Sequence, residues 1–362
     1  MSTEAWLVAF SIQQWNNYMN NCFDAIGYSI STTSSVVSSM VVDMFEDLGV
    51  SKMLLSFKAI AQDVILAGCA GFLTGLLYAS NLFVKSSLGF IPSLLLVFVT
   101  IASVDAITPK LVETDFGTWS QLSLTLTRLQ QNLQKVINKT LKKYLESGIS
   151  TKFGIFSAIK SGFLIQENST PTPAEMEQNI NYHLQAKILN KIMRSNNLYI
   201  TRASDPCHFS GVAGARAGND IMSYCDSEGV LWEIVRAQGK GVKHEIYNAN
   251  LISNRYGFSL ETIIQSSWAC QTKYLDFEHE TFDSLYTLGN TNSTDLIDGS
   301  NFSENKNLTD LNPIEVRNLI SLDECLFNLP VCDCALPDIH LARASKKHHT
   351  TKICREIGKL PI

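Results

Sequence analysis

Apolar residues recur at helical spacing through the first fifty residues of the chain. Trp15, Met19, Cys22, Phe23 and Ile26 follow one another mostly at steps of three and four residues, which places them on one face of an amphipathic helix. The pattern continues from 36 to 48 and stops at Gly49, a residue typical of helix ends. We therefore predict one long helix or two shorter helices over residues 1–50.

The segment 64–104 is almost entirely apolar, with a single charge at Lys85. Each half is close to the ~20 residues that a helix needs to cross the hydrocarbon core of a bilayer. Small residues that favour close helix packing recur at every fourth position of the first half: Ala67, Gly71, Gly75 and Ala79. Apolar residues suited to lipid contact crowd the second half: Leu94, Leu95, Leu96, Phe98 and Ile101.

Three interpretations of this apolar hairpin stay open. It inserts permanently as two spans, it forms the buried core of a soluble helical region, or it inserts only on contact with a membrane. The charged residues on either side of it show no clear positive-inside bias. A long helix, an apolar hairpin and a further long helix in this order are similar to the architecture of α-helical pore-forming toxins, which is an analogy at the level of the fold alone.

Two long helices are predicted next after the hairpin. A heptad seam runs through 118–146 on five residues: Leu122, Leu126, Leu129, Leu133 and Val136. Thr172, Pro173 and Glu175 have the spacing of a capping box. They predict a helix that begins at Pro173 and ends near 195–197.

The pattern changes after Leu198 to alternating and β-branched runs. These predict a small sheet with strands in 198–204, 220–225 and 230–237, and short helices at 259–272 and 313–324. The acidic stretch 276–311 is expected to be an exposed loop. We predict an α+β protein whose mainly helical region, 1–200, carries the hairpin and is followed by a small disulfide-stabilised α+β domain, 201–362.

Cysteines and sequons favour an oxidising compartment. Seven of the nine cysteines fall in the C-terminal part and are disulfide candidates: Cys207, Cys225, Cys270, Cys325, Cys332, Cys334 and Cys354. Since seven is odd, one is free, or pairs with Cys22 or with another chain. Cys22 and Cys69 lie in apolar contexts and are expected to be buried thiols. The glycosylation candidates are Asn138, Asn168, Asn292, Asn301 and Asn307.

The formal net charge of −5 argues against nucleic acid as a partner, because phosphate binding requires clustered Lys and Arg. The expected partner is a lipid bilayer, together with further copies of the chain as a homo-oligomer.

Candidate chemistry is weak, and we expect no cofactor, no metal and no catalytic residue. The spacing of Cys325, Cys332 and Cys334 is not the usual zinc-ligand spacing. The glycines around Arg216 match neither phosphate-loop motif. Asp205, Cys207 and His208 are neighbours in sequence, whereas a catalytic dyad is assembled in space. His348 and His349 are expected in a solvated basic tail. An enzyme on the C-terminal domain stays open as a third function class, which a pocket holding His208 or His244 with an acid would favour.

Several blocks carry a resemblance to a known family. They are "GISTKFGIFSAIKSG" (148–162), "SDPC" (204–207), "SYCDSEG" (223–229), "IVRAQG" (234–239), "NANLISNRYGFS" (248–259), "WACQTKY" (268–274), "LPVCDC" (329–334), "GKLPI" at the end and "QQWNNYMNNCFDAIGYS" near the start. The chain resembles uncharacterised, mostly fungal secreted proteins that are known only as a domain of unknown function. The resemblance implies secretion and disulfides, and it implies no activity.

The first residues do not have the form of a signal peptide. The resemblance implies a signal peptide and a further cysteine upstream of the first helix, so a missing start, an internal signal in the hairpin and a cytosolic protein are all open. We predict a membrane-interacting, non-enzymatic protein that is secreted or membrane-associated. The alternative is a soluble secreted binding or structural module whose hairpin is buried core.

Overall fold

The computed structural model describes residues 2–44, 172–277, 325–345 and 349–362, together with part of 127–165. These residues fall into two compact units. One unit includes residues up to Val36 and the described part of 127–184; the other includes 37–44, 185–277 and 325–362. The apolar hairpin, its contact residues and the seam of the heptad helix lie outside the described residues.

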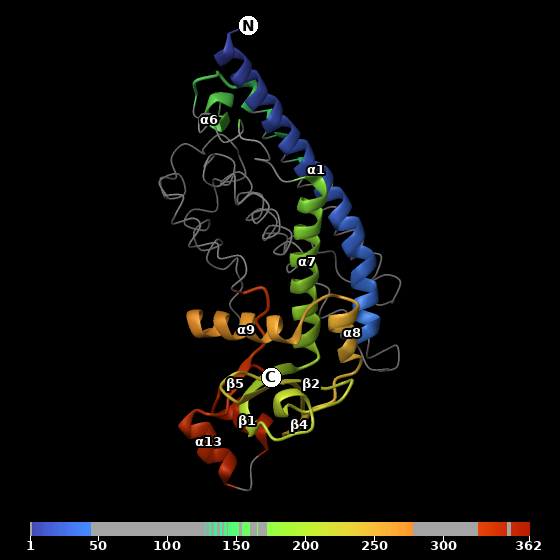
Figure 1. The fold of residues 1–362 in the computed structure, drawn as a ribbon, viewed down its shortest axis with the longest axis vertical. Helices are drawn as coiled ribbons and strands as arrows, with labels where there is room; N and C mark the ends of the chain where they lie inside the picture. Colours follow the sequence, from blue (N-terminus) through green and yellow to red (C-terminus); the bar gives the residue numbers. More distant parts are fainter. Residues whose placement is uncertain are drawn as a thin grey trace, which may run out of the picture. The chain divides into compact units, whose positions relative to one another are not determined.

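Helix α1 (Thr3–Met44) is one continuous helix (Figure 1). Of the two predicted alternatives, one long helix or two shorter helices, the first is therefore correct. The face marked by the apolar spacing is buried in the first unit: Trp15, Met19, Cys22 and Ile26 are at most 1% exposed. The Trp15 ring packs on Tyr144 with the centroids 5.5 Å apart. Gln134 donates from Nε2 to the Phe23 carbonyl at 3.2 Å. The described residues of 127–146 are helical, and Gln131, Lys135, Lys139 and Lys142 are exposed.

Helix α7 (Pro173–Ser195) begins at the predicted capping box. The Thr172 N–H donates to Glu175 Oε2 at 2.7 Å, and the Glu175 N–H donates back to Thr172 Oγ1 at 3.2 Å. The hydrogen bonds that the Glu175 carboxylate accepts from the Thr172 N–H and hydroxyl lower the pKa of this carboxyl group, because they favour its charged form. The short helix α6 (Ile155–Ile159) precedes α7. No described helix has an apolar stretch long enough to cross a bilayer.

A mixed sheet organises the second unit. Strands β1 (Leu198–Pro206), β2 (Met222–Cys225), β3 (Val230–Gln238) and β5 (Val331–Asp333) lie in the order β2-β3-β1-β5, and β4 (Gly241–Lys243) pairs with β3. Pairing with β3 is antiparallel, whereas β1 and β5 are parallel, with Ile200 opposite Val331. The α+β class is therefore confirmed. The strand expectations for 198–204, 220–225 and 230–237 are confirmed within a few residues.

Five helical segments accompany this sheet. They are η3 (Val212–Gly214), α8 (Ala249–Asn254), α9 (Leu260–Tyr274), α13 (Pro337–Ala344) and α14 (Thr350–Glu356). Only α9 was predicted among them. The expected basic tail is wrong beyond His349, because α14 is packed: Thr351, Ile353 and Cys354 are buried. His349 itself is exposed at the N-cap of α14.

The segment 325–330 is completely buried without belonging to a strand or helix. Side chains of α7 and α9 hydrogen-bond its backbone. Asn190 Oδ1 accepts from the Asn328 N–H at 3.0 Å, and Ser267 Oγ accepts from the Leu329 N–H at 3.0 Å. The ammonium group of Lys187, itself 1% exposed, donates to the Cys325 carbonyl. These contacts satisfy backbone groups that would otherwise be costly to bury.

Candidate functional site

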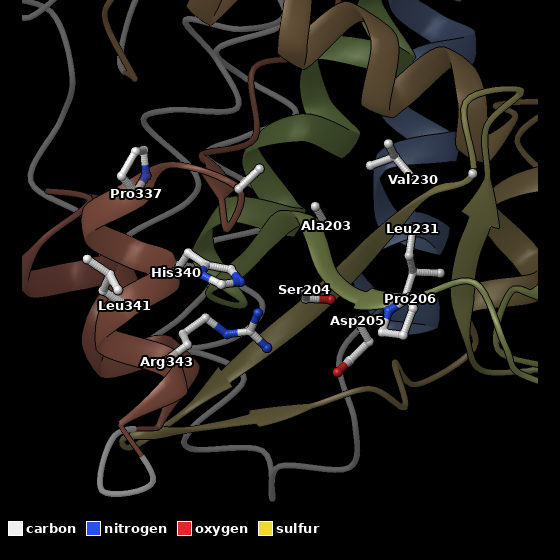
Figure 2. Close-up of a pocket in the computed structure, with 12 residues that line it drawn as sticks. Ala203, Ser204, Asp205, Pro206, Val230, Leu231, Pro337, His340, Leu341 and Arg343 are labelled. Carbon is white, nitrogen blue, oxygen red and sulfur yellow. The ribbon is translucent and has the colours of Figure 1, made fainter.

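A cavity of about 740 Å³ opens beside β1 in the second unit. Its walls are residues 203–206 of β1, the turn and start of β3 at 229–231, Ala335, and four residues of α13, which are Pro337, His340, Leu341 and Arg343. Figure 2 shows His340 and Arg343 extending from α13 toward Ser204 and Asp205. Polar groups from separate elements thus face a common space, which is the usual form of a small-ligand site.

An irregularity of β1 shapes this cavity. The register with β3 shifts between Arg202 and Pro206, and Ala203 has a left-handed backbone with φ of 54°. Such a bulge re-aims the side chains that follow it, and a non-glycine residue with positive φ carries local strain. Ser204 and Asp205 come directly after the strained residue, so the bulge determines where their side chains lie.

A buried ion network lies behind Ser204. Glu233 on β3 is 1% exposed, and its Oε2 accepts from the Ser204 hydroxyl at 3.3 Å. Its Oε1 lies 2.8 Å from Arg216 Nε and 3.3 Å from His244 Nδ1. These two contacts are close enough to pair charges, although neither has the alignment of a hydrogen bond. Arg216 also binds Asp205 at 2.8 Å, so one guanidinium serves two carboxylates.

This network is arranged differently from a nucleophile triad. In a triad the histidine lies between the hydroxyl and the acid, whereas here Glu233 lies between Ser204 and His244. His244 does meet an acid, but it is not among the residues that line the cavity. His208 is exposed, and its Nδ1 lies 2.8 Å from the Pro206 carbonyl. The network therefore neutralises a buried carboxylate and holds Ser204 and Asp205 in place.

Arg343 is a cation of the cavity wall that has no carboxylate partner among the described residues. Its Nε donates to Thr350 Oγ1 at 3.3 Å. Among the residues that the structure describes, no carboxylate lies within ion-pair distance of its guanidinium. Asp205 on the opposite wall is already paired with Arg216. The α13 side of the cavity is thus suited to an anionic group, since guanidinium binds carboxylates and phosphates well.

Six of the seven C-terminal cysteines form disulfides. The pairs are Cys207–Cys225, Cys270–Cys325 and Cys332–Cys354. Cys334 is free and buried, and it is therefore the odd cysteine of the seven. The Sγ atoms of Cys332, Cys334 and Cys354 all lie within 4.8 Å of one another. Cys325, which belonged with Cys332 and Cys334 in the discounted zinc pattern, is instead bonded to Cys270.

The loop from Cys207 to Cys225 contains the glycines around Arg216. Gly214 has φ of +86°, and a Cβ at this position would lie 2.5 Å from the Cys207 carbonyl oxygen. The Arg216 guanidinium stacks over the Phe209 ring at 3.8 Å. This loop thus positions Arg216 for the ion network.

Other candidate residues have simpler placements. Cys22 is free and buried, as expected, and burial raises the pKa of its thiol to about 12. Asn138 is exposed on a helical stretch. The remaining glycosylation candidates, Asn168, Asn292, Asn301 and Asn307, lie outside the described residues, as do Cys69 and most of the expected acidic loop.

Sequence reasoning missed most of the cavity. Ser204, Glu233, His340 and Arg343 lie in three elements, and no spacing in the sequence connects them. Two signals were available in the sequence. One is the charged residue Glu233 among the apolar residues at the start of "VLWEIVRA", and the other is the odd number of C-terminal cysteines. The first points to a buried polar contact and the second to an unpaired thiol, and neither identifies a partner.

The described part of the chain is an α+β protein with three disulfides, and these bonds are consistent with an oxidising environment. Residues 108–298 and 305–362 match the family described as "Domain of unknown function (DUF7872)", and the chain belongs to this family. The expected membership of a family of unknown function is confirmed. No curated protein and no solved structure matches the chain.

Proposed function

We propose that this chain is a secreted or membrane-associated, non-enzymatic protein that interacts with membranes through the apolar hairpin 64–104. The observation that carries the proposal is the pair of apolar segments on either side of Lys85, each near the length that crosses a bilayer. Insertion is either permanent or, as in α-helical pore-forming toxins, triggered by membrane contact, with several copies assembling. In this proposal the disulfide-stabilised C-terminal domain works outside the bilayer.

Liposome flotation tests this proposal. The full chain is compared with a variant lacking 64–104, using neutral phosphatidylcholine vesicles because the net charge of −5 gives no attraction to anionic lipid. We expect the full chain to float with the vesicles and the deletion variant to stay at the bottom. Equal flotation of the two forms would overturn the proposal.

A matched pair of point variants refines the test. Leu96→Arg places a charge in the middle of the second apolar segment, where lipid insertion makes it costly. Ser87→Arg adds the same charge beside Lys85, at the expected turn. We expect Leu96→Arg to reduce flotation strongly and Ser87→Arg to have little effect. If both variants unfold or both float, the hairpin does not act as an inserted element.

The cavity beside β1 favours a second candidate, a soluble secreted module that binds a small anionic ligand. The observation behind it is the Arg343 guanidinium, which lines the cavity opposite Ser204 without a carboxylate partner among the described residues (Figure 2). A ligand phosphate or carboxylate would supply that partner. This candidate does not depend on the hairpin, which is then buried core.

Calorimetric titration with inorganic phosphate tests the second candidate. We expect binding by the unmodified chain and at least about tenfold weaker binding by Arg343→Gln, since a charge-assisted bond is worth ~1.5–3 kcal/mol. Lys352→Gln on α14, which also removes one positive charge, is the control and is expected to bind normally. Equal phosphate binding by Arg343→Gln and the unmodified chain would exclude the cavity as an anion site.

A further inference from the structure

Three cysteines of the second unit meet at one point in the core. Cys332 and Cys354 form a disulfide between β5 and α14, and Cys334 is a free thiol directly after β5. All three Sγ atoms lie within 4.8 Å of one another, and none of the three residues is exposed. A thiol held beside a disulfide is the arrangement from which thiol–disulfide exchange starts.

We propose that Cys332, Cys334 and Cys354 form an internal exchange centre that interconverts two disulfide isomers. The Cys334 thiolate attacks Cys354 Sγ, the Cys334–Cys354 bond forms, and the Cys332–Cys354 bond breaks. Cys332 leaves as a thiolate and takes up the proton that Cys334 lost. The number of disulfides is unchanged, so the step needs neither an oxidant nor a reductant. It is independent of the function proposed above.

The charges around Cys334 set the rate of exchange. Burial raises the pKa of its thiol to about 11, while Arg343 on α13 opposes this shift through its charge and a hydrogen bond. The carboxylates of Asp333 on β5 and Asp205 on β1 raise the pKa further. The Tyr199 hydroxyl on β1 also interacts electrostatically with this thiol. The thiol is directed at the Cys332 carbonyl, 3.8 Å away. Because only the thiolate attacks, exchange is slow at neutral pH and accelerates about tenfold per pH unit below the pKa.

The two isomers differ in what holds the sheet edge. In the observed isomer the disulfide ties α14 to Cys332, which lies opposite Thr201 within the parallel pairing of β1 and β5. In the second isomer α14 is tied to Cys334, beyond the end of β5, and the strand loses its covalent link. Cys334 also interacts with Arg343, which lines the cavity. Exchange therefore changes the environment of the cation on the α13 wall.

Disulfide mapping of the intact folded chain tests the centre. The protein is incubated at about pH 7, 8 and 9, quenched in acid, labelled with N-ethylmaleimide in acidic denaturant, and digested with pepsin so that no exchange occurs during handling. Backbone fragment ions of the peptic peptides distinguish label on Cys332 from label on Cys334, because Asp333 lies between the two cysteines. Among Cys332, Cys334 and Cys354, we expect label mainly on Cys334 and a minor fraction on Cys332 that appears about tenfold faster per pH unit. Label that stays on Cys334 alone at every pH overturns the proposal.

Three variants complete the test. Cys334→Ser is expected to abolish label on Cys332, whereas Cys22→Ser, which removes the other buried free thiol among the described residues, leaves exchange unchanged. Cys332→Ser is expected to form the Cys334–Cys354 disulfide directly. If folded Cys332→Ser instead retains two free thiols after air oxidation, the second isomer is not accessible and the proposal fails. Should Cys332→Ser not fold, the mapping of the unmodified chain still decides.

Discussion

The side chain of Gln271 on α9 takes the place of a neighbouring strand for Val331 on β5. Its Oε1 accepts from the Val331 N–H at 2.9 Å, and its Nε2 donates to the Leu329 carbonyl at 2.5 Å. Gln271 is 8% exposed, so water cannot readily replace it. A single amide thereby satisfies two backbone groups where the buried segment 325–330 enters the sheet.

Replacing this amide is therefore expected to be costly. Gln271→Ala leaves the Val331 N–H and the Leu329 carbonyl buried without partners, at ~1–3 kcal/mol for each unsatisfied group. We expect the free energy of unfolding to fall by about 2–4 kcal/mol in urea titration under oxidising conditions. Gln265→Ala on the same helix is the control, because Gln265 is exposed and, within the described residues, its side chain hydrogen-bonds Glu261 alone. Similar losses in the two variants would contradict this account of the segment.

The ion network behind Ser204 gives a second prediction. Glu233→Ala removes the buried carboxylate that Arg216 and His244 face, and breaking a buried ion pair costs ~3–5 kcal/mol. Since Arg216 keeps Asp205 as a partner, we expect a loss of about 2–3 kcal/mol in the free energy of unfolding. Glu228→Ala, at an exposed position of the same hairpin, should change it by less than about 0.5 kcal/mol. A Glu233→Ala variant as stable as Glu228→Ala would show that the network contributes nothing.

Asp226 predicts a dependence on pH. Burial raises the pKa of its carboxyl group, but hydrogen bonds from the Trp232 indole and from the Val230 and Glu228 N–H groups outweigh burial and lower the pKa overall. A folded-state pKa below the unfolded value stabilises the fold above the unfolded pKa, and the stabilisation is lost as pH falls through the folded value.

The variant Asp226→Asn checks this dependence. An amide has one oxygen, so either the indole N–H at 2.8 Å or the backbone donors would face an NH₂ group. We expect a loss of about 1–2 kcal/mol at pH values above about 5, which shrinks below about pH 4 as the native carboxyl group becomes protonated. Urea unfolding followed by tryptophan fluorescence measures the loss of stability in both pH ranges. A loss that is the same at about pH 3 and pH 6 would contradict the assignment.

Local patterns predicted the elements that depend on local chemistry. The capping box at Thr172 determined the start of α7, and alternation in "VLWEIVRA" determined β3, because both signals lie within a few residues. The segment 325–330 and α13 could not be predicted in the same way. The burial of 325–330 depends on Gln271, Asn190 and other side chains far away in sequence, which no periodicity records. The cavity was missed for the same reason, since a strand bulge and a separate helix create it together.

For the cysteines, too, the sequence predicted what depends on local composition and not what depends on the fold. Their density predicted disulfides and their odd number predicted an unpaired thiol. Which cysteine stays unpaired depends on the fold. Cys332 lies in β5, opposite Thr201 of β1, and is bonded to Cys354, whereas Cys334 follows the end of the strand. Spacing alone could not distinguish two cysteines separated by one residue.

The loop closed by Cys207 and Cys225 gives the last prediction, from two glycines with left-handed backbones. Gly214 has φ of +86° and Gly229 has φ of +76°, so alanine at either position carries a backbone strain of ~1 kcal/mol. A Cβ at Gly229 meets nothing within 4 Å, whereas a Cβ at Gly214 would lie 2.5 Å from the Cys207 carbonyl oxygen. We therefore expect Gly229→Ala to lower the free energy of unfolding by about 1 kcal/mol and Gly214→Ala by at least about twice as much.

The two variants should also differ in disulfide formation. The clash at Gly214 pushes against the backbone of Cys207 itself, so Gly214→Ala is expected to slow oxidative formation of Cys207–Cys225, which quenched mass spectrometry follows. Gly229 lies in the turn between β2 and β3, beyond Cys225, and Gly229→Ala should leave that rate unchanged. Equal stability losses and equal oxidation rates would mean that the loop yields at Gly214, and that the close approach to Cys207 does not fix the position of Arg216.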